Sequence, residues 1–249
     1  MTNQTRTPAT PSEISAAYRA AAEREAQRIQ SGATIVGHKV GFTNTSAWAQ
    51  LGASAPMWGA MYNDTVIDIS ETPFRYSLAS LTGPRIEPEI VMHFAKAPAA
   101  DASLEALLAC VDWMAQGYEL VVSPADGKPA TVPQAIANGG MHGALLVGER
   151  RPVEALGDDL VSRLQQATLE LHCDGELKEE GASAVVLGNP LNSIVHLMKG
   201  LAAEGRAPIQ AGAVITTGTI PAAYPVAAGQ RWTTRIAGLD LPDLDVIFE

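Results

Sequence analysis

The stretch from Arg85 to Met92 constrains the chain most, because it places two carboxylates on one face of an extended segment. It reads Arg-Ile-Glu-Pro-Glu-Ile-Val-Met. Side chains alternate between the two faces of a strand, so Glu87 and Glu89 project together, and most of their apolar neighbours lie opposite. Two carboxylates this close repel each other unless a positive charge lies between them. Mg²⁺ and Mn²⁺ prefer oxygen ligands, so the pair predicts a divalent-metal site.

The same pair also fits an ordinary solvent-facing strand. Acidic residues two positions apart are common on the wet face of a half-exposed sheet. Pro88 cannot donate a ladder hydrogen bond, so it suits an edge strand, a bulge or the start of a strand. An edge beside an open cleft would fit a metal site, and a plain exposed edge would fit equally well. The pattern alone leaves both interpretations open.

The bulk properties exclude several classes of protein. The chain has 249 residues, 47% of them hydrophobic and 18% charged, which is typical of a globular domain with a buried core. Its net charge of −10 disfavours nucleic acid and anionic lipid as partners. We expect no membrane association, because the sequence has no signal-peptide core and no bilayer-spanning run. Cys110 and Cys173 lack the spacing of a disulfide framework or metal site, which favours a reduced, cytoplasmic setting.

Turn and cap signals predict a mixed α/β (α+β) domain built around a rolled sheet. Residues 1–12 are expected to be a disordered lead-in, and 13–249 a single domain, with a helical and flap-like part at about 13–80 and a sheet core at about 81–249. The flap is expected at 44–62, whose large apolar side chains would also suit core packing. Helices are predicted at 12–32, 103–115 and 190–205, and strands at 34–40, 65–69, 86–94, 118–122, 143–147, 167–173, 213–217, 231–236 and 244–248, with a hairpin turn at Asp174-Gly175.

Two further charged residues lie in apolar strands. Glu119 opens the run Leu-Val-Val, where an unpaired charge would be costly, and it is the candidate third carboxylate of a Mg²⁺ site. Lys39 lies in an apolar, glycine-flanked strand and needs a partner or a function there. Each could instead be a strand-end charge in water. The histidines show no paired metal spacing, and we interpret each of them as structural.

Six motifs together make the chain resemble the fumarylacetoacetate hydrolase superfamily, within it the branch of 2-keto-4-pentenoate hydratases and 4-oxalocrotonate decarboxylases. The resemblance runs from about Ser15 to the C-terminus. Each motif is weak alone, and their order and spacing make the match specific. The motifs are Gly37–Thr43, Pro84–Glu89, Gly117–Glu119, Gly143–Gly148, Leu187–Leu191 and Thr216–Thr219.

The resemblance implies a β-roll with flanking helices, often assembled as a homo-oligomer, that uses Mg²⁺ or Mn²⁺. It also implies residue roles. The metal ligands would be Glu87, Glu89 and Glu119; the acid–base pair would be Lys39 and Asp64; and the residues near a bound 2-oxo acid would be Thr43, Arg85, Ser123 and Thr219.

The expected reaction is addition of water to a 2-hydroxy-2,4-dienoate to give a 4-hydroxy-2-oxo acid. Decarboxylation of a 2-oxo-3-enedioate would use the same electron sink, and acylpyruvate hydrolysis is a third outcome. Related sequences often carry an aspartate where this chain has Asn138. That departure leaves open a catalytically idle subunit that pairs with a related family member.

Overall fold

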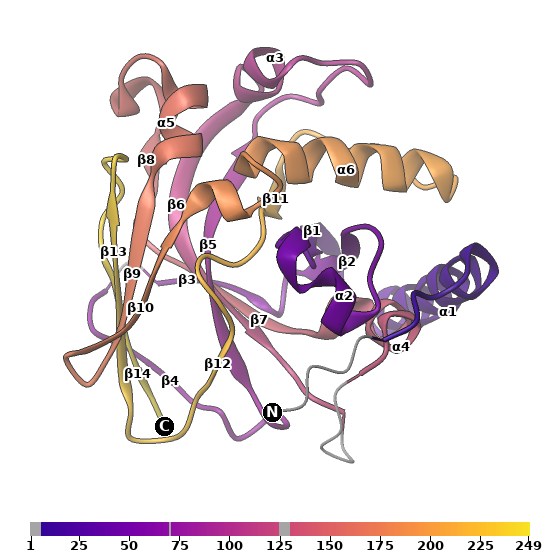
Figure 1. The fold of residues 1–249 in the computed structure, drawn as a ribbon, viewed down its shortest axis with the longest axis horizontal. Helices are drawn as coiled ribbons and strands as arrows, with labels where there is room; N and C mark the ends of the chain where they lie inside the picture. The colour runs from indigo at the N-terminus through magenta and orange to yellow at the C-terminus, as the bar shows by residue number, and fades with distance from the viewer. Residues whose placement is uncertain (1–5, 70, 125–129) are drawn as a thin grey trace.

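Two β-sheets form the framework of the protein, as the computed structural model shows for residues 6–69, 71–124 and 130–249 (Figure 1). The larger sheet has the strand order β2-β1-β11-β5-β6-β7-β3, with β12 added to β5 and β8 to β6. Its strands are β1 (Ile35–Gly41), β2 (Met57–Tyr62), β3 (Val66–Asp68), β5 (Arg85–Phe94), β6 (Val111–Val121), β7 (His142–Val147), β8 (Arg151–Pro152), β11 (Ala213–Thr216) and β12 (Tyr224–Pro225).

The smaller sheet has the order β10-β9-β13-β14-β4. Strand β14 is antiparallel to β13 and parallel to β4, which comes from far earlier in the chain. The predicted hairpin at Asp174-Gly175 joins β9 to β10. The strands are β4 (Phe74–Tyr76), β9 (Thr168–Cys173), β10 (Glu176–Ala182), β13 (Arg231–Ala237) and β14 (Leu244–Phe248).

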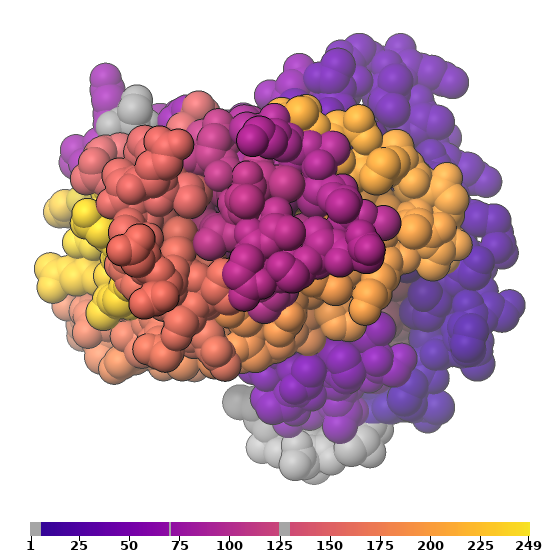
Figure 2. All heavy atoms as spheres, turned by 90° about the horizontal axis from the view of Figure 1, so that it is seen from above, coloured from indigo at the N-terminus to yellow at the C-terminus, as the bar shows by residue number. Residues whose placement is uncertain are grey.

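Helices pack against the edge of the larger sheet at β1 and β2. In Figure 1, α6 lies over β1 and β2, while α1 and α4 pack together at the right, where α4 contacts β2. Seen from above, the segments that carry α5, α3 and α6 lie side by side over one end of the molecule (Figure 2). The helices are α1 (Pro11–Gln30), α2 (Trp48–Leu51), α3 (Leu104–Leu108), α4 (Val132–Ala137), α5 (Leu160–Gln166) and α6 (Pro190–Ala203), with 3₁₀ turns η1 (Thr45–Ala47), η2 (Gly139–Met141), η3 (Val153–Leu156) and η4 (Ser183–Val185).

Helix α6 forms as its sequence predicts. Asn189 caps it by accepting a hydrogen bond from the Leu191 amide at 3.0 Å, and Pro190 occupies the first turn. Its buried stripe faces the core, and Gly205 follows its end with a φ of +62°. The stripe comprises Leu191, Ile194, Leu197 and Leu201.

The N-terminal helix begins slightly earlier than predicted. Thr10, rather than Ser12, caps α1, because Thr10 and Glu13 form a reciprocal capping box and Pro11 supplies the first helical position. Residues 11 and 12 of the expected lead-in are therefore helical. Residues 1–5 of that lead-in lie outside the described part of the chain.

The helix predicted at 103–115 is wrong beyond its first turns. Only Leu104–Leu108 is helical, and β6 begins at Val111. The reason is tertiary pairing: β5 runs to Phe94, and β6 must reach Val111 to satisfy its backbone groups. The ring of Trp113, within β6, stacks on His93 of β5 at 5.0 Å between ring centroids.

The mixed α/β (α+β) class is confirmed. Strands β1, β2 and β3, from the expected N-terminal part, pair within the same sheet as β5, β6 and β7. The second half of the expected flap, Met57–Tyr62, is a buried strand, β2. Within the described residues, no helix is long and apolar enough to cross a lipid bilayer.

Candidate metal centre

Three carboxylates converge where β5 and β6 lie side by side. Glu87 pairs directly with Glu119 across these antiparallel strands, and Glu89 lies two residues further along β5 on the same face. One oxygen from each of the three residues lies within 4.8 Å of the others. Glu89 and Glu119 are fully buried. Carboxylates up to 32 positions apart in the chain thus form one acidic cluster on one face of the sheet.

Lys39 brings a single buried ammonium to this cluster. Its Nζ lies 3.1 Å from Glu119 Oε2, and its side chain is 1% exposed. Burial acts to lower the pKa of Lys39, but the charges of Glu119, Glu87 and Glu89 outweigh it and raise that pKa above its usual value. The ammonium is therefore held protonated, as a cation.

The cluster contains less positive charge than its three carboxylates need for neutrality when they are ionised. Burial is the main cause that raises the pKa of Glu87 to about 7 and the pKa of Glu89 well above its usual value. Burial also acts to raise the pKa of Glu119, yet Lys39 and the hydrogen bond with His142 lower it overall. Three carboxylates facing one ammonium would carry two uncompensated negative charges when ionised, which is the charge of one divalent cation.

The donor set fits such a cation. Glu89 Oε2 accepts a hydrogen bond from the Gly218 amide at 2.6 Å, while Glu89 Oε1 is buried with no hydrogen-bond partner among the described residues. A buried carboxylate oxygen without a partner is costly unless something binds it. Mg²⁺ and Mn²⁺ take carboxylate oxygens and keep further positions for water or ligand. Glu87, Glu89 and Glu119 could hold the ion.

His142 orients the third carboxylate, and sequence reasoning missed it. Its Nδ1 lies 3.0 Å from Glu119 Oε1, and its Nε2 lies 3.0 Å from Thr65 Oγ1. An ionised carboxylate only accepts, so the hydrogen of this pair belongs to Nδ1. The available signal was register: His142 begins β7, the strand that pairs with β6 at Glu119.

Two predicted substrate residues lie beside Glu89. Thr43 is 2% exposed, and its side chain packs on Gly218, the residue whose amide binds Glu89. Thr219 follows Gly218, and its Oγ1 is buried without a hydrogen-bond partner among the described residues. Both hydroxyls are therefore close to the carboxylate cluster, and that of Thr219 is free to bind a ligand.

Arg85 and Ser123 lie at the outer end of the cluster's strands. Arg85 is exposed, donates to the Ala223 carbonyl, and lowers the pKa of Glu87 by its charge. Ser123 follows β6 and donates to the Gly83 carbonyl at 3.1 Å. The cluster's outer rim is thus cationic and polar.

Asp64 is not brought to the cluster. It lies in the turn after β2, its side chain is 58% exposed, and it pairs with Arg28 of α1 at 2.7 Å. Asn138, where related sequences often carry aspartate, accepts a hydrogen bond from Arg24 of α1 at 2.6 Å and caps α4 through the Gln134 carbonyl. The Asp64–Arg28 pair holds α1 against the turn after β2. The Asn138–Arg24 hydrogen bond holds α1 against the end of α4.

A buried acidic cluster beside a lysine, on a rolled sheet, is a type of site that metal-dependent enzymes use. The family described as fumarylacetoacetate (FAA) hydrolase C-terminal matches residues 25–241. The chain belongs to this family.

Relatives of two activities resemble the chain to similar degrees. A 4-oxalocrotonate decarboxylase from Pseudomonas putida is 31% identical over 231 residues, covering 90% of this chain and 81% of the relative. A 2-keto-4-pentenoate hydratase 1 from Dechloromonas aromatica (strain RCB) is 26% identical over 212 residues, covering 85% of this chain and 77% of the relative.

Solved structures agree with the fold. The 4-oxalocrotonate decarboxylase from Pseudomonas putida G7, complexed with magnesium and adipate, has a TM-score of 0.82 and 28% identity, covering 94% of this chain and 85% of that one. The fumarylpyruvate hydrolase from Pseudomonas aeruginosa, in complex with Mn²⁺ and pyruvate, has a TM-score of 0.63 at 18% identity, covering 85% and 88%, and shows the fold alone.

Proposed function

We propose that the protein is a divalent-metal-dependent hydro-lyase that adds water to a 2-hydroxy-2,4-dienoate of the 2-keto-4-pentenoate type. The observation that carries this proposal is the convergence of Glu87, Glu89 and Glu119 within 4.8 Å beside the ammonium of Lys39. Relatives named as hydratases and decarboxylases support the same reaction class.

The metal proposed is Mg²⁺ or Mn²⁺. When bound, it would act as a Lewis acid on the carboxylate and 2-oxygen of the substrate, a contribution worth several kcal/mol of transition-state stabilisation. The three carboxylates would hold it, and the neighbour structure that contains magnesium supports a divalent ion of this kind.

Lys39 would move the proton. Ketonisation removes the proton of the 2-hydroxyl and places one on C5 of the dienoate, and hydration then places hydroxide on C4 and a proton on C3. A protonated lysine next to the reaction centre can deliver such protons and stabilise negative charge on the substrate. The free hydroxyl of Thr219, with Thr43 and Arg85, would orient the carboxylate end, and Ser123 would lie near it.

The acid–base role that the resemblance implied for Asp64 is not part of this proposal. Its exposed ion pair with Arg28 favours a structural role for Asp64, so we assign the proton transfers to Lys39.

Decarboxylation of a 2-oxo-3-enedioate is the second candidate. A decarboxylase relative at 31% identity and a decarboxylase structure with a TM-score of 0.82 favour it. We further propose a homo-oligomeric assembly in the cytoplasm, or a complex with a related family member.

Two measurements test the proposal. Incubation with 2-hydroxypenta-2,4-dienoate and, separately, 2-oxo-3-hexenedioate is followed by loss of ultraviolet absorbance and release of CO₂. Turnover of the monoacid supports the hydro-lyase, and CO₂ from the diacid without turnover of the monoacid replaces it with the decarboxylase. Turnover of neither substrate would favour the catalytically idle subunit.

Metal binding is tested separately by thermal unfolding. Mg²⁺ should raise the Tm of the wild type by mass action, and Glu89→Gln should abolish the shift. Glu149→Gln, which changes an exposed glutamate between β7 and β8, is the matched control and should keep it.

A further inference from the structure

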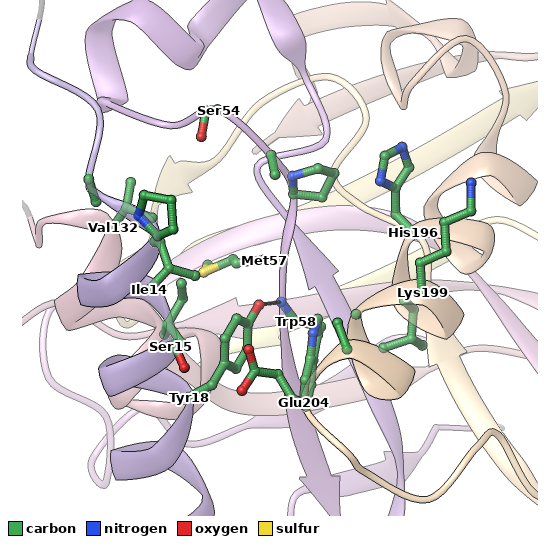
Figure 3. A pocket seen from close by; sticks show the side chains of 18 of the residues that line it. Ile14, Ser15, Tyr18, Ser54, Met57, Trp58, Val132, His196, Lys199 and Glu204 are labelled. Atoms are coloured by element: carbon green, nitrogen blue, oxygen red, sulfur yellow. Dashed lines mark hydrogen bonds between the residues drawn. The ribbon is translucent and has the colours of Figure 1, made fainter.

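A cavity of about 520 Å³ lies at the free edge of β2. It is bounded by α1, α4, α6 and the segment that leads into β2. Figure 3 shows Ile14 and Tyr18 of α1, Val132 of α4, and Met57 and Trp58 of β2 around one space. The Tyr18 hydroxyl accepts a hydrogen bond from the Trp58 amide at 3.3 Å, which fastens α1 to the strand. Cavities of this size hold small molecules.

Met57 separates this cavity from Lys39. It pairs with Gly41 across β1 and β2, on the face that carries Lys39. A Cβ placed on Gly41 would lie 3.0 Å from Met57 Cε and 3.1 Å from Lys39 Nζ, so both groups border that point. Met57 also lines the cavity and is 4% exposed. One flexible, unbranched side chain therefore stands between the cavity and the proposed proton donor.

The lining favours an apolar guest. Ile14, Val132 and Ile136 contribute hydrocarbon next to Met57. The charged lining residues are one lysine and one glutamate, Lys199 and Glu204, so the lining carries no net charge. A second carboxylate on the substrate would find no surplus cation there, whereas an alkyl tail would gain about fourfold in affinity per buried methylene.

We propose that this cavity receives an apolar tail extending from C5 of the dienoate, and that Met57 is the side chain that moves aside to admit it. The proposal rests on the proposed function and narrows its substrate to tailed monoacids. It concerns the distal end of the substrate, away from the carboxylates that would hold the metal.

The test compares two substrates, 2-hydroxypenta-2,4-dienoate and 2-hydroxyocta-2,4-dienoate, by the ratio of their kcat/KM values. Ile14→Phe fills the cavity from α1, and Ile29→Phe is the matched control, an exposed isoleucine on the same helix. We expect Ile14→Phe to lower the preference for the longer substrate at least tenfold and Ile29→Phe to leave it unchanged. Met57→Ala should raise that preference.

A second pair of variants tests the cavity even if Ile14→Phe does not fold. Ala203 lines the cavity from α6, and Ala202 lies next to it outside the lining; both are exposed. Ala203→Phe should lower the preference for the longer substrate, and Ala202→Phe should not. Unchanged ratios in Ile14→Phe and Ala203→Phe, with turnover intact, would overturn the tail site and leave the proposed function standing.

Direct binding covers the case in which neither dienoate reacts, which would refute the proposed function. The wild type is titrated calorimetrically with 2-oxobutanoate and 2-oxooctanoate in the presence of Mg²⁺. Tighter binding of 2-oxooctanoate that Ile14→Phe removes and Ile29→Phe keeps would support the tail site. Equal affinities in the wild type would reject it.

Discussion

Glu119 and His142 are joined across neighbouring strands by a 3.0 Å contact between Glu119 Oε1 and His142 Nδ1. The second oxygen of Glu119 faces Lys39. The histidine thus fixes the rotation of a carboxylate that serves the ammonium and, by our proposal, a metal ion. Residues that orient metal ligands through hydrogen bonds commonly matter nearly as much as the ligands.

Two amide variants of His142 separate its two contacts. The Nδ2 of asparagine can take the place of Nδ1, whereas the Nε2 of glutamine matches the imidazole Nε2 that faces Thr65. We expect His142→Gln to weaken Mg²⁺ binding about 10–100-fold and His142→Asn to stay within a few-fold of the wild type. Calorimetric titration with Mg²⁺ measures both. Equal losses in the two variants would indicate that His142 serves packing alone.

Gly140 packs directly on Lys39, and this contact predicts a sensitive position. A Cβ on Gly140 would lie 2.7 Å from Lys39 Cδ, at a φ of +71°. Gly140→Ala should displace the lysine and lower kcat at least tenfold. The left-handed backbone conformation should in addition lower the folding stability by about 1–2 kcal/mol. Gly139→Ala is the control, because Gly139 has a similar φ of +66° and nothing within 4 Å of its added Cβ. Similar kcat values in the two variants would contradict the prediction.

Removing the ammonium separates proton transfer from metal binding. Lys39→Met keeps the side-chain length but deletes the charge beside Glu119. Turnover should fall about 10²–10⁴-fold, the usual contribution of a positioned acid or base. Mg²⁺ affinity should hold or rise, because a positive charge that repels the ion is gone. A parallel loss of turnover and Mg²⁺ affinity would place Lys39 in the metal site rather than in proton transfer.

The acidic cluster predicts that the metal-free protein loses stability as pH rises. Glu87 has a folded pKa of about 7, above its unfolded value near 4.5, and Glu89 is raised as well. A carboxyl with a raised folded pKa stabilises the fold fully below the unfolded pKa, and this contribution is lost as pH rises through the folded pKa. Urea unfolding from pH 5 to 8 should therefore show declining stability, and Glu87→Gln should flatten the decline.

Magnesium should counter that decline, because it binds the ionised carboxylates. The rise in Tm at fixed Mg²⁺ should grow between pH 5 and 8 as the cluster loses protons. A shift in Tm that is constant across this range would argue against binding at the cluster.

Asp64 supplies a prediction of little effect. Its exposed pair with Arg28 should contribute at most about 1 kcal/mol, so Asp64→Asn should fold stably and keep kcat near the wild-type value. A loss of turnover of a hundredfold with unchanged Tm would restore the acid–base role that resemblance suggested for this residue.

Much of the candidate site follows from strand alternation. Glu87 and Glu89 had to share a face once Arg85–Phe94 was a strand. The apolar flanks of Lys39 and Glu119 left open whether these charges are buried, and the structure buries both. The register between neighbouring strands could not be predicted from the sequence. This register decides that Glu119 faces Glu87 and that His142 reaches Glu119. Local signals also failed at 109–115, where pairing with β5 outweighs helix propensity.

The place of β14 in the smaller sheet has a consequence for how the protein forms. β14 lies between β13 and β4, and β4 precedes it by most of the chain. While the ribosome is still adding residues, β4 has no strand to join, because its neighbour has not been made. The smaller sheet can close only after β14 has been synthesised. Such long-range pairing is slow and exposes a strand edge to aggregation. Chaperone dependence of newly made protein should therefore centre on β4.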